Sequence, residues 1–137
     1  MRWIIFTLLL LSLPVMAEKQ PVFGPVSAPT LAKLPPKMAE AKQQADAIVA
    51  AVAEYEKEQG HPPESLSSLI PKPFDFLPDP PAKARTDWTY WNCERSWVLA
   101  VGFEDGSTLA YGARVLPSSI PGFGALKVRL GQWGVYE

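Results

Sequence analysis

Apolar residues recur every three or four positions between residues 38 and 59, and this spacing predicts an amphipathic helix. The seam consists of Met38, Ala41, Ala45, Ile48, Val52 and Tyr55. Pro35 and Pro36 stand before the segment, where proline is tolerated, and Gly60 follows it in the position of a C-terminal cap. We therefore expect one helix over residues 38–59, with its seam on the hydrophobic core.

The next segment, residues 61–86, is rich in proline and is expected to contain little regular structure. Residues 63–70 fit a short helix, and the side chains expected to face inward are Leu66, Leu69 and Ile70. Residues 71–85 are expected to form an irregular loop. The apolar residues expected to hold this loop on the core are Phe74, Phe76 and Leu77.

After residue 87 the apolar period changes to two, which is typical of β-strands. The expected strands are residues 88–91, 97–103, 108–115 and 126–130. Residues 104–106 read as a hairpin turn, and residues 133–136 are expected to extend the last strand past a bulge. The alternation predicts an antiparallel sheet with one wet face, so the fold class is α+β, with one long helix packed on about four strands.

The first 17 residues have the pattern of an export signal. Arg2 precedes an apolar run that begins at Trp3, and Ala17 ends a small-x-small cleavage pattern. A spanning helix needs about 20 apolar residues, more than this run supplies, although an uncleaved inner-membrane anchor remains the alternative. The resulting organisation is a signal peptide (1–17), a Pro-rich linker (18–37) and one α+β domain (38–137), in a periplasmic or secreted protein with no stable membrane span after cleavage.

Composition narrows the chemistry that this chain of 137 residues can carry. One Cys excludes an intrachain disulfide framework and a multi-Cys metal cluster, and one His excludes a multi-His metal centre. The formal net charge is −1, from 13 basic and 14 acidic residues, with no basic run. Nucleic-acid binding depends on clustered Lys and Arg, so a nucleic-acid partner is not expected, and neither is a cofactor or a metal.

The segment from residue 45 to residue 69 resembles the globular part of type IV pilins and type II secretion pseudopilins. The resemblance rests on a helix that ends in Tyr, followed by Gly, Pro and a Ser-Leu-x-x-Leu turn, at Tyr55, Gly60, Pro63, Leu66 and Leu69. It extends over residues 45–115 at best and implies a pilin-like soluble domain. The chain departs from pilin precursors because it lacks their Gly cleavage site and acidic fifth residue, and prolines interrupt residues 21–36.

The candidate site residues are few. Cys93 and His61 have the residue types of a nucleophile and a base, but nothing in the sequence positions a third group, so we expect no enzyme. Glu54 and Glu58 lie one turn apart near the end of the expected helix, where carboxylates oppose the helix macrodipole. Trp91 is expected to lie on a different pleat from Trp88 and Tyr90, whereas Trp97 is expected in the core.

Together these features favour a non-enzymatic exported domain that acts by protein–protein contact in the bacterial envelope. Glu54, Glu58 and Trp91 are the residues expected to touch the envelope protein partner. The alternative is a periplasmic ligand- or glycan-binding domain that uses exposed aromatic side chains.

Overall fold

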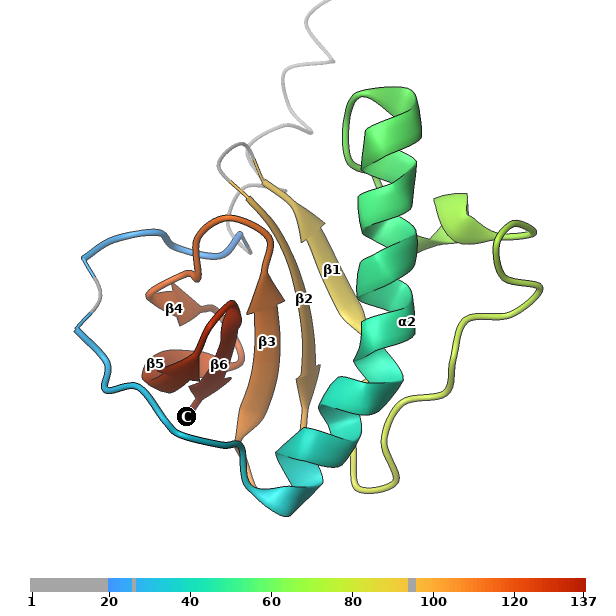
Figure 1. Ribbon diagram of the computed structural model, residues 1–137. Coiled ribbons are helices and arrows are strands. Elements are labelled where there is room, and N and C mark those ends of the chain that lie inside the picture. The colour runs from blue at the N-terminus through green and yellow to red at the C-terminus, as the bar shows by residue number, and fades with distance from the viewer. Residues whose placement is uncertain (1–19, 26, 94–95) are drawn as a thin grey trace, which may run out of the picture.

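The computed structural model describes residues 20–25, 27–93 and 96–137 (Figure 1). The expected signal peptide, with its cleavage site at Ala17, lies outside the described residues. The elements in chain order are α2 (Pro36–Gln59), the 3₁₀ turn η2 (Leu66–Leu69), β1 (Thr89–Asn92), β2 (Trp97–Gly102), β3 (Thr108–Gly112), β4 (Ser119–Ile120), β5 (Gly124–Leu130) and β6 (Trp133–Tyr136).

Helix α2 confirms the expected helix, both in its buried seam and in the glycine that ends it. Most of the predicted seam is buried, with Ile48 and Val52 each 0% exposed, whereas Tyr55 is half-buried. Gly60 ends the helix in a left-handed conformation with φ of 85°, and its N–H donates to the carbonyl of Glu56. Glycine adopts this conformation without the steric cost that a Cβ imposes, so the helix ends at the predicted residue.

The strands form one antiparallel sheet in the order β1-β2-β3-β6-β5-β4, and the sheet curls into a half-barrel (Figure 1). The prediction that residues 133–136 extend the preceding strand is wrong. Gly131 has φ of 61°, and the chain reverses there so that Leu130 pairs with Trp133. The strand β6 then inserts between β3 and β5, because a two-residue turn closes a hairpin where a bulge was expected.

The curl gives the sheet a core on each face. On the first face, Trp97, Leu99 and Val101 pack with α2 and η2 in the larger hydrophobic cluster. On the opposite face, Val98 and Ala100 belong to a second cluster, which the other half of the sheet covers. Every residue of β2 is therefore buried, and the expectation of one wet face is wrong.

The predicted fold class is also wrong in its architecture. The described residues contain a single α-helix, which begins only at Pro36, and six strands rather than about four. The domain is mostly β, and its curled sheet is not the expected pilin-like arrangement of a long N-terminal helix on a four-stranded sheet. The two strands that were not expected are β4 and β6. The first has only two residues, and the second follows a tight turn, so the period-two pattern does not mark either as a separate strand.

An extended arm precedes the helix and lies along the far edge of the sheet (Figure 1). Val22 bridges to Ser119 of β4, and Thr30 bridges to Arg129 of β5. The arm supplies backbone partners to an edge that would otherwise be open to association with another strand.

The segment after the helix forms η2 and then an irregular loop, as expected. Leu66 and Leu69 are buried, but Ile70 is 40% exposed and Phe76 is 86% exposed, so the prediction that these two face the core is wrong. No helix in the described ranges is long and apolar enough to cross a bilayer.

Candidate functional site

Two hollows flank the last turns of α2. The first, which we call the groove, has a volume of about 330 Å³ and lies between the helix and the loop that follows η2. Its lining residues are Ala51, Glu54, Tyr55, Glu58, Leu69, Lys72 and Pro73. The second, which we call the cleft, has a volume of about 460 Å³ and lies between the helix end and one end of the sheet.

The groove combines apolar walls with an acidic rim. Leu69 is 0% exposed and Ala51 is 7% exposed, and the ring of Tyr55 and Pro73 add apolar surface. Both Glu54 and Glu58 are exposed, and neither forms an ion pair with any residue that the structure describes. Their carboxylates also lie near the helix C-terminus, where the macrodipole favours cations.

The structure thus brings the two predicted glutamates together on the rim of one groove. The other wall was not foreseen, because Leu69 and Lys72 come from the proline-rich segment. Only the helical spacing of Glu54 and Glu58 could have indicated this site from the sequence.

Trp91 lies elsewhere. It pairs with Val98 across β1 and β2, so its side chain is on the sheet face opposite α2. It is half-buried and packs edge-on against Phe123, with ring centroids 5.8 Å apart. The structure therefore does not place Trp91 on one surface with the glutamate pair. Trp97 is 3% exposed, which confirms its predicted core position.

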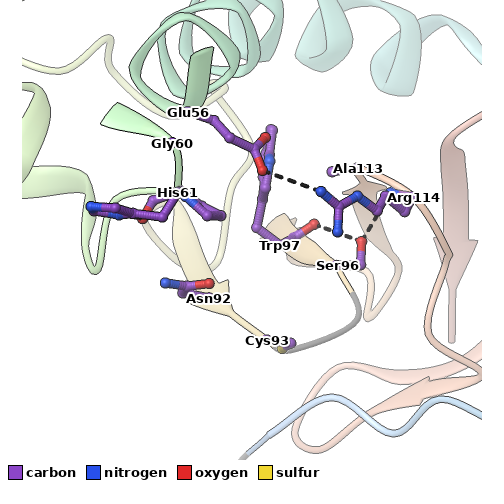
Figure 2. A pocket seen from close by; sticks show the side chains of 10 residues that line it. Glu56, Gly60, His61, Asn92, Cys93, Ser96, Trp97, Ala113 and Arg114 are labelled. Carbon is purple, nitrogen blue, oxygen red and sulfur yellow. Dashed lines mark hydrogen bonds and ion pairs between the residues drawn. The ribbon is translucent and has the colours of Figure 1, made fainter. Parts of the chain in front are cut away.

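The cleft is polar and carries charges of both signs (Figure 2). Its lining residues are Glu56, Gly60, His61, Pro62, Asn92, Cys93, Ser96, Trp97, Ala113 and Arg114. The Arg114 guanidinium donates to the Glu56 carboxylate across 3.5 Å, and the backbone N–H of Arg114 donates to the Ser96 hydroxyl across 3.0 Å. The sequence indicated only His61 and Cys93 of this set, because Glu56, Ser96 and Arg114 come from segments far apart in the chain.

Cys93 and His61 both line the cleft but have different partners. The Cys93 thiol donates to the side-chain oxygen of Gln20 across 3.6 Å, and His61 Nδ1 donates to the carbonyl of Pro62 across 3.0 Å. Burial raises the pKa of the Cys93 thiol above its ordinary value, so the unreactive protonated form is favoured. The arrangement therefore holds no activated thiol.

The described residues hold no group of three or more His, Cys, Asp or Glu side chains that could bind a metal ion. Comparison of the chain with protein-family models, with curated proteins and with solved structures gives no match. With the half-barrel topology, this result overturns the resemblance to pilins and pseudopilins. The string from Tyr55 to Leu69 describes a helix end and a tight turn, which are local features and not marks of that family.

Proposed function

We propose that this chain is an exported, non-enzymatic domain that acts by binding another protein of the bacterial envelope through the groove. The observation that carries the proposal is the pair of carboxylates, Glu54 and Glu58, that stand over apolar walls without an ion partner among the described residues. Apolar surface that binding removes from water provides affinity, and opposite charges on the two proteins select and orient the partner.

The chemistry of the groove specifies its occupant. An apolar side chain of the partner would fill the space against Leu69 and Pro73, and Lys or Arg residues beside it would meet Glu54 and Glu58. A basic side chain is also favoured by the negative end of the helix macrodipole. The occupant that we propose is therefore a protein segment with one apolar residue flanked by basic residues.

Export is the part of the proposal that depends on residues 1–17. Their short apolar run and the pattern ending at Ala17 support cleavage and release into the periplasm or the medium. Intact-mass analysis of the exported protein should give an N-terminus at Glu18. Recovery of the full mass from Met1 in a membrane fraction would favour the inner-membrane anchor instead.

Site-specific photo-crosslinking tests the groove in the producing cell. A benzoylphenylalanine residue at Lys72, on the groove wall, should crosslink one envelope protein. Mass spectrometry should locate the attachment in a segment that has an apolar residue flanked by Lys or Arg. The same probe at Lys83, an exposed residue that does not line the groove, should give no such product.

Charge reversal supplies the matched comparison. The double variant Glu54→Lys with Glu58→Lys should abolish the crosslink from position 72, because it places basic residues against basic residues. Glu40→Lys changes the charge at an exposed position near the other end of α2 and should leave the crosslink intact. Equal crosslinking from positions 72 and 83, or attachment to an acidic segment, would contradict the proposal.

A further inference from the structure

One exposed apolar side chain of this domain has the surroundings that the groove selects in a partner. Among the described residues, the exposed large apolar side chains are Val22, Ile70, Phe76 and Val115. Val115 is 41% exposed, and Arg114 and Arg129 line the same hollow of about 280 Å³ that Val115 lines. We call Val115 with these two arginines the basic patch. It presents one apolar residue beside two basic residues.

The other exposed apolar side chains do not fit the groove in this way. Phe76 is 86% exposed, but it follows Asp75 in the chain, and the acidic rim of a groove would repel that carboxylate. Ile70 belongs to the loop that forms a wall of the groove itself. Val22 lies in the part of the arm that pairs with β4, and neither β4 nor residues 20–25 contain a basic residue. The basic patch is therefore the surface that matches.

The backbone under the basic patch is held in place by hydrogen bonds. The Ser96 hydroxyl accepts from the backbone N–H of Arg114 across 3.0 Å and from that of Val115 across 3.4 Å. The side-chain amide of Gln132 donates to the carbonyl of Ala113 across 2.6 Å. Because this turn is ordered before any binding, little backbone entropy is lost when the patch docks.

The charges of the basic patch and of the groove are complementary. Arg129 is exposed and forms no ion pair with any residue that the structure describes. Arg114 contacts Glu56 across 3.5 Å, but its side chain is 67% exposed, so solvent screens this pair. In the groove, Glu54 and Glu58 stand over apolar walls. Each surface thus has an apolar centre and two charges, and the charges are of opposite sign.

The basic patch faces away from the groove of its own chain. Successive helix residues are rotated by about 100°, so Glu56, the contact of Arg114, lies near the opposite side of α2 from Glu54 and Glu58. The patch and the groove are therefore on different sides of the same helix end. Their complementary surfaces can meet only between two copies of the chain.

We infer that a second copy of this chain binds in the groove: Val115 of one copy enters the groove of the other, and its two arginines meet the two glutamates of the rim. The inference rests on the proposed function in one respect, because both take the groove as a protein-binding site. The contact joins different surfaces, so a dimer leaves one groove and one patch free for further copies. Self-association therefore competes with the envelope partner for the groove.

Sedimentation velocity of the purified mature domain measures this association. One apolar anchor and two charge pairs make a small interface, so the average mass should rise only as the concentration approaches the millimolar range. The rise should shrink at high salt, because salt screens the charges. A groove variant, Glu54→Gln with Glu58→Gln, should weaken self-association at least about tenfold, and a patch variant, Arg114→Gln with Arg129→Gln, should do the same.

Mixing the two variants identifies the surfaces that meet. The groove variant keeps an intact patch and the patch variant keeps an intact groove, so the mixture should form a dimer with one copy of each and nothing larger. Each variant alone should stay monomeric at the same concentration. Lys33→Gln with Lys83→Gln removes two charges at exposed positions that line neither surface, and it should associate like wild type.

Exchange of the charges within one chain keeps the test independent of any loss of folding. Glu54→Lys and Glu58→Lys are combined with Arg114→Glu and Arg129→Glu, which leaves the net charge unchanged. Self-association should return in this chain, because opposite charges again face one another across the contact.

Three results would overturn the inference: a domain that stays monomeric at every concentration, a mixture of the two variants that stays monomeric although wild type associates, or a patch variant that associates as strongly as wild type. The crosslink from position 72 separates this inference from the proposed function. An envelope protein crosslinked by a domain that stays monomeric would contradict the inference alone. Self-association as predicted, with no envelope protein crosslinked, would contradict the proposed function alone.

Discussion

The groove and the cleft lie beside the same helix end but differ in charge and chemistry. Successive helix residues are rotated by about 100° around the axis, so Glu54 and Glu58 share one side of α2 and Glu56 lies near the opposite side. The groove receives two carboxylates without an ion partner among the described residues, whereas the carboxylate of the cleft is paired with Arg114. Glu54 and Glu58 therefore belong to the groove, whereas Glu56, which stands between them in the sequence, belongs to the cleft.

The walls of the two hollows are also held differently. The second wall of the groove is a loop, in which the N–H of Phe74 donates to the carbonyl of Leu69 across 3.1 Å. The cleft lies against the sheet, where its residue Ser96 accepts from the backbone N–H of Arg114. Its residue Trp97 packs against Tyr90, whose hydroxyl donates to the carbonyl of Pro63. Changes in the sheet should therefore affect the cleft, and changes in the loop should affect the groove.

The largest expected effect comes from the element that both hollows share. Val52 is 0% exposed, so Val52→Asp places an unpaired carboxylate in the core and should lower the free energy of unfolding by about 3 kcal/mol or more. Ala53→Asp makes the same charge change one residue later at an exposed position and should cost less than about 1 kcal/mol. Urea denaturation measures both. Equal stability of the two variants would mean that α2 does not pack as described.

A smaller effect should distinguish Tyr90, which packs against the cleft residue Trp97, from Tyr55, which lines the groove. Tyr90→Phe removes the hydroxyl that donates to Pro63, and it should cost about 1 kcal/mol of unfolding free energy. Tyr55→Phe removes a hydroxyl on the groove side that has no hydrogen bond to any described residue, and it should cost less than about 0.5 kcal/mol. Thermal or urea unfolding checks the pair. A larger loss for Tyr55→Phe would contradict the hydrogen bond from the Tyr90 hydroxyl as the stabilising difference between the two tyrosines.

The smallest effect concerns the ion pair of the cleft. Arg114→Gln removes the contact with Glu56, but the Arg114 side chain is 67% exposed and solvent screens the pair. The free energy of unfolding should fall by less than about 1 kcal/mol. Denaturation at low and high salt should show a difference between wild type and variant that shrinks as salt rises. A salt-independent loss of several kcal/mol would show that the pair is structural.

Helix α2 could be predicted because its determinants are local. The three-and-four spacing of the seam and the glycine at position 60 act within a few residues of one another. The strand β6 could not be separated in the same way. Apolar residues at positions 126, 128 and 130 and at positions 133 and 135 fit a strand with a bulge as well as a reversal. The left-handed conformation of Gly131 decides between the two.

The candidate site could also be predicted only where its determinants are local in the sequence. The spacing of Glu54 and Glu58 is enough to predict that they share one side of the helix. Their apolar neighbours, Leu69 and Pro73, come from a segment without periodicity, whose path depends on contacts with the core. Arg114 is distant in sequence from Glu56, so their contact follows from how the sheet meets the helix and not from any local pattern.

The most direct test of the account measures how salt affects binding to the groove. A synthetic peptide that carries the partner segment identified by crosslinking from position 72 is titrated into the mature domain at low and high ionic strength. The account predicts that affinity falls as salt rises, and that Glu54→Lys with Glu58→Lys weakens binding at least about tenfold and removes this dependence, while Glu40→Lys does neither. The same affinity and the same salt dependence in the double variant would contradict the central claim that the acidic groove binds a basic protein segment.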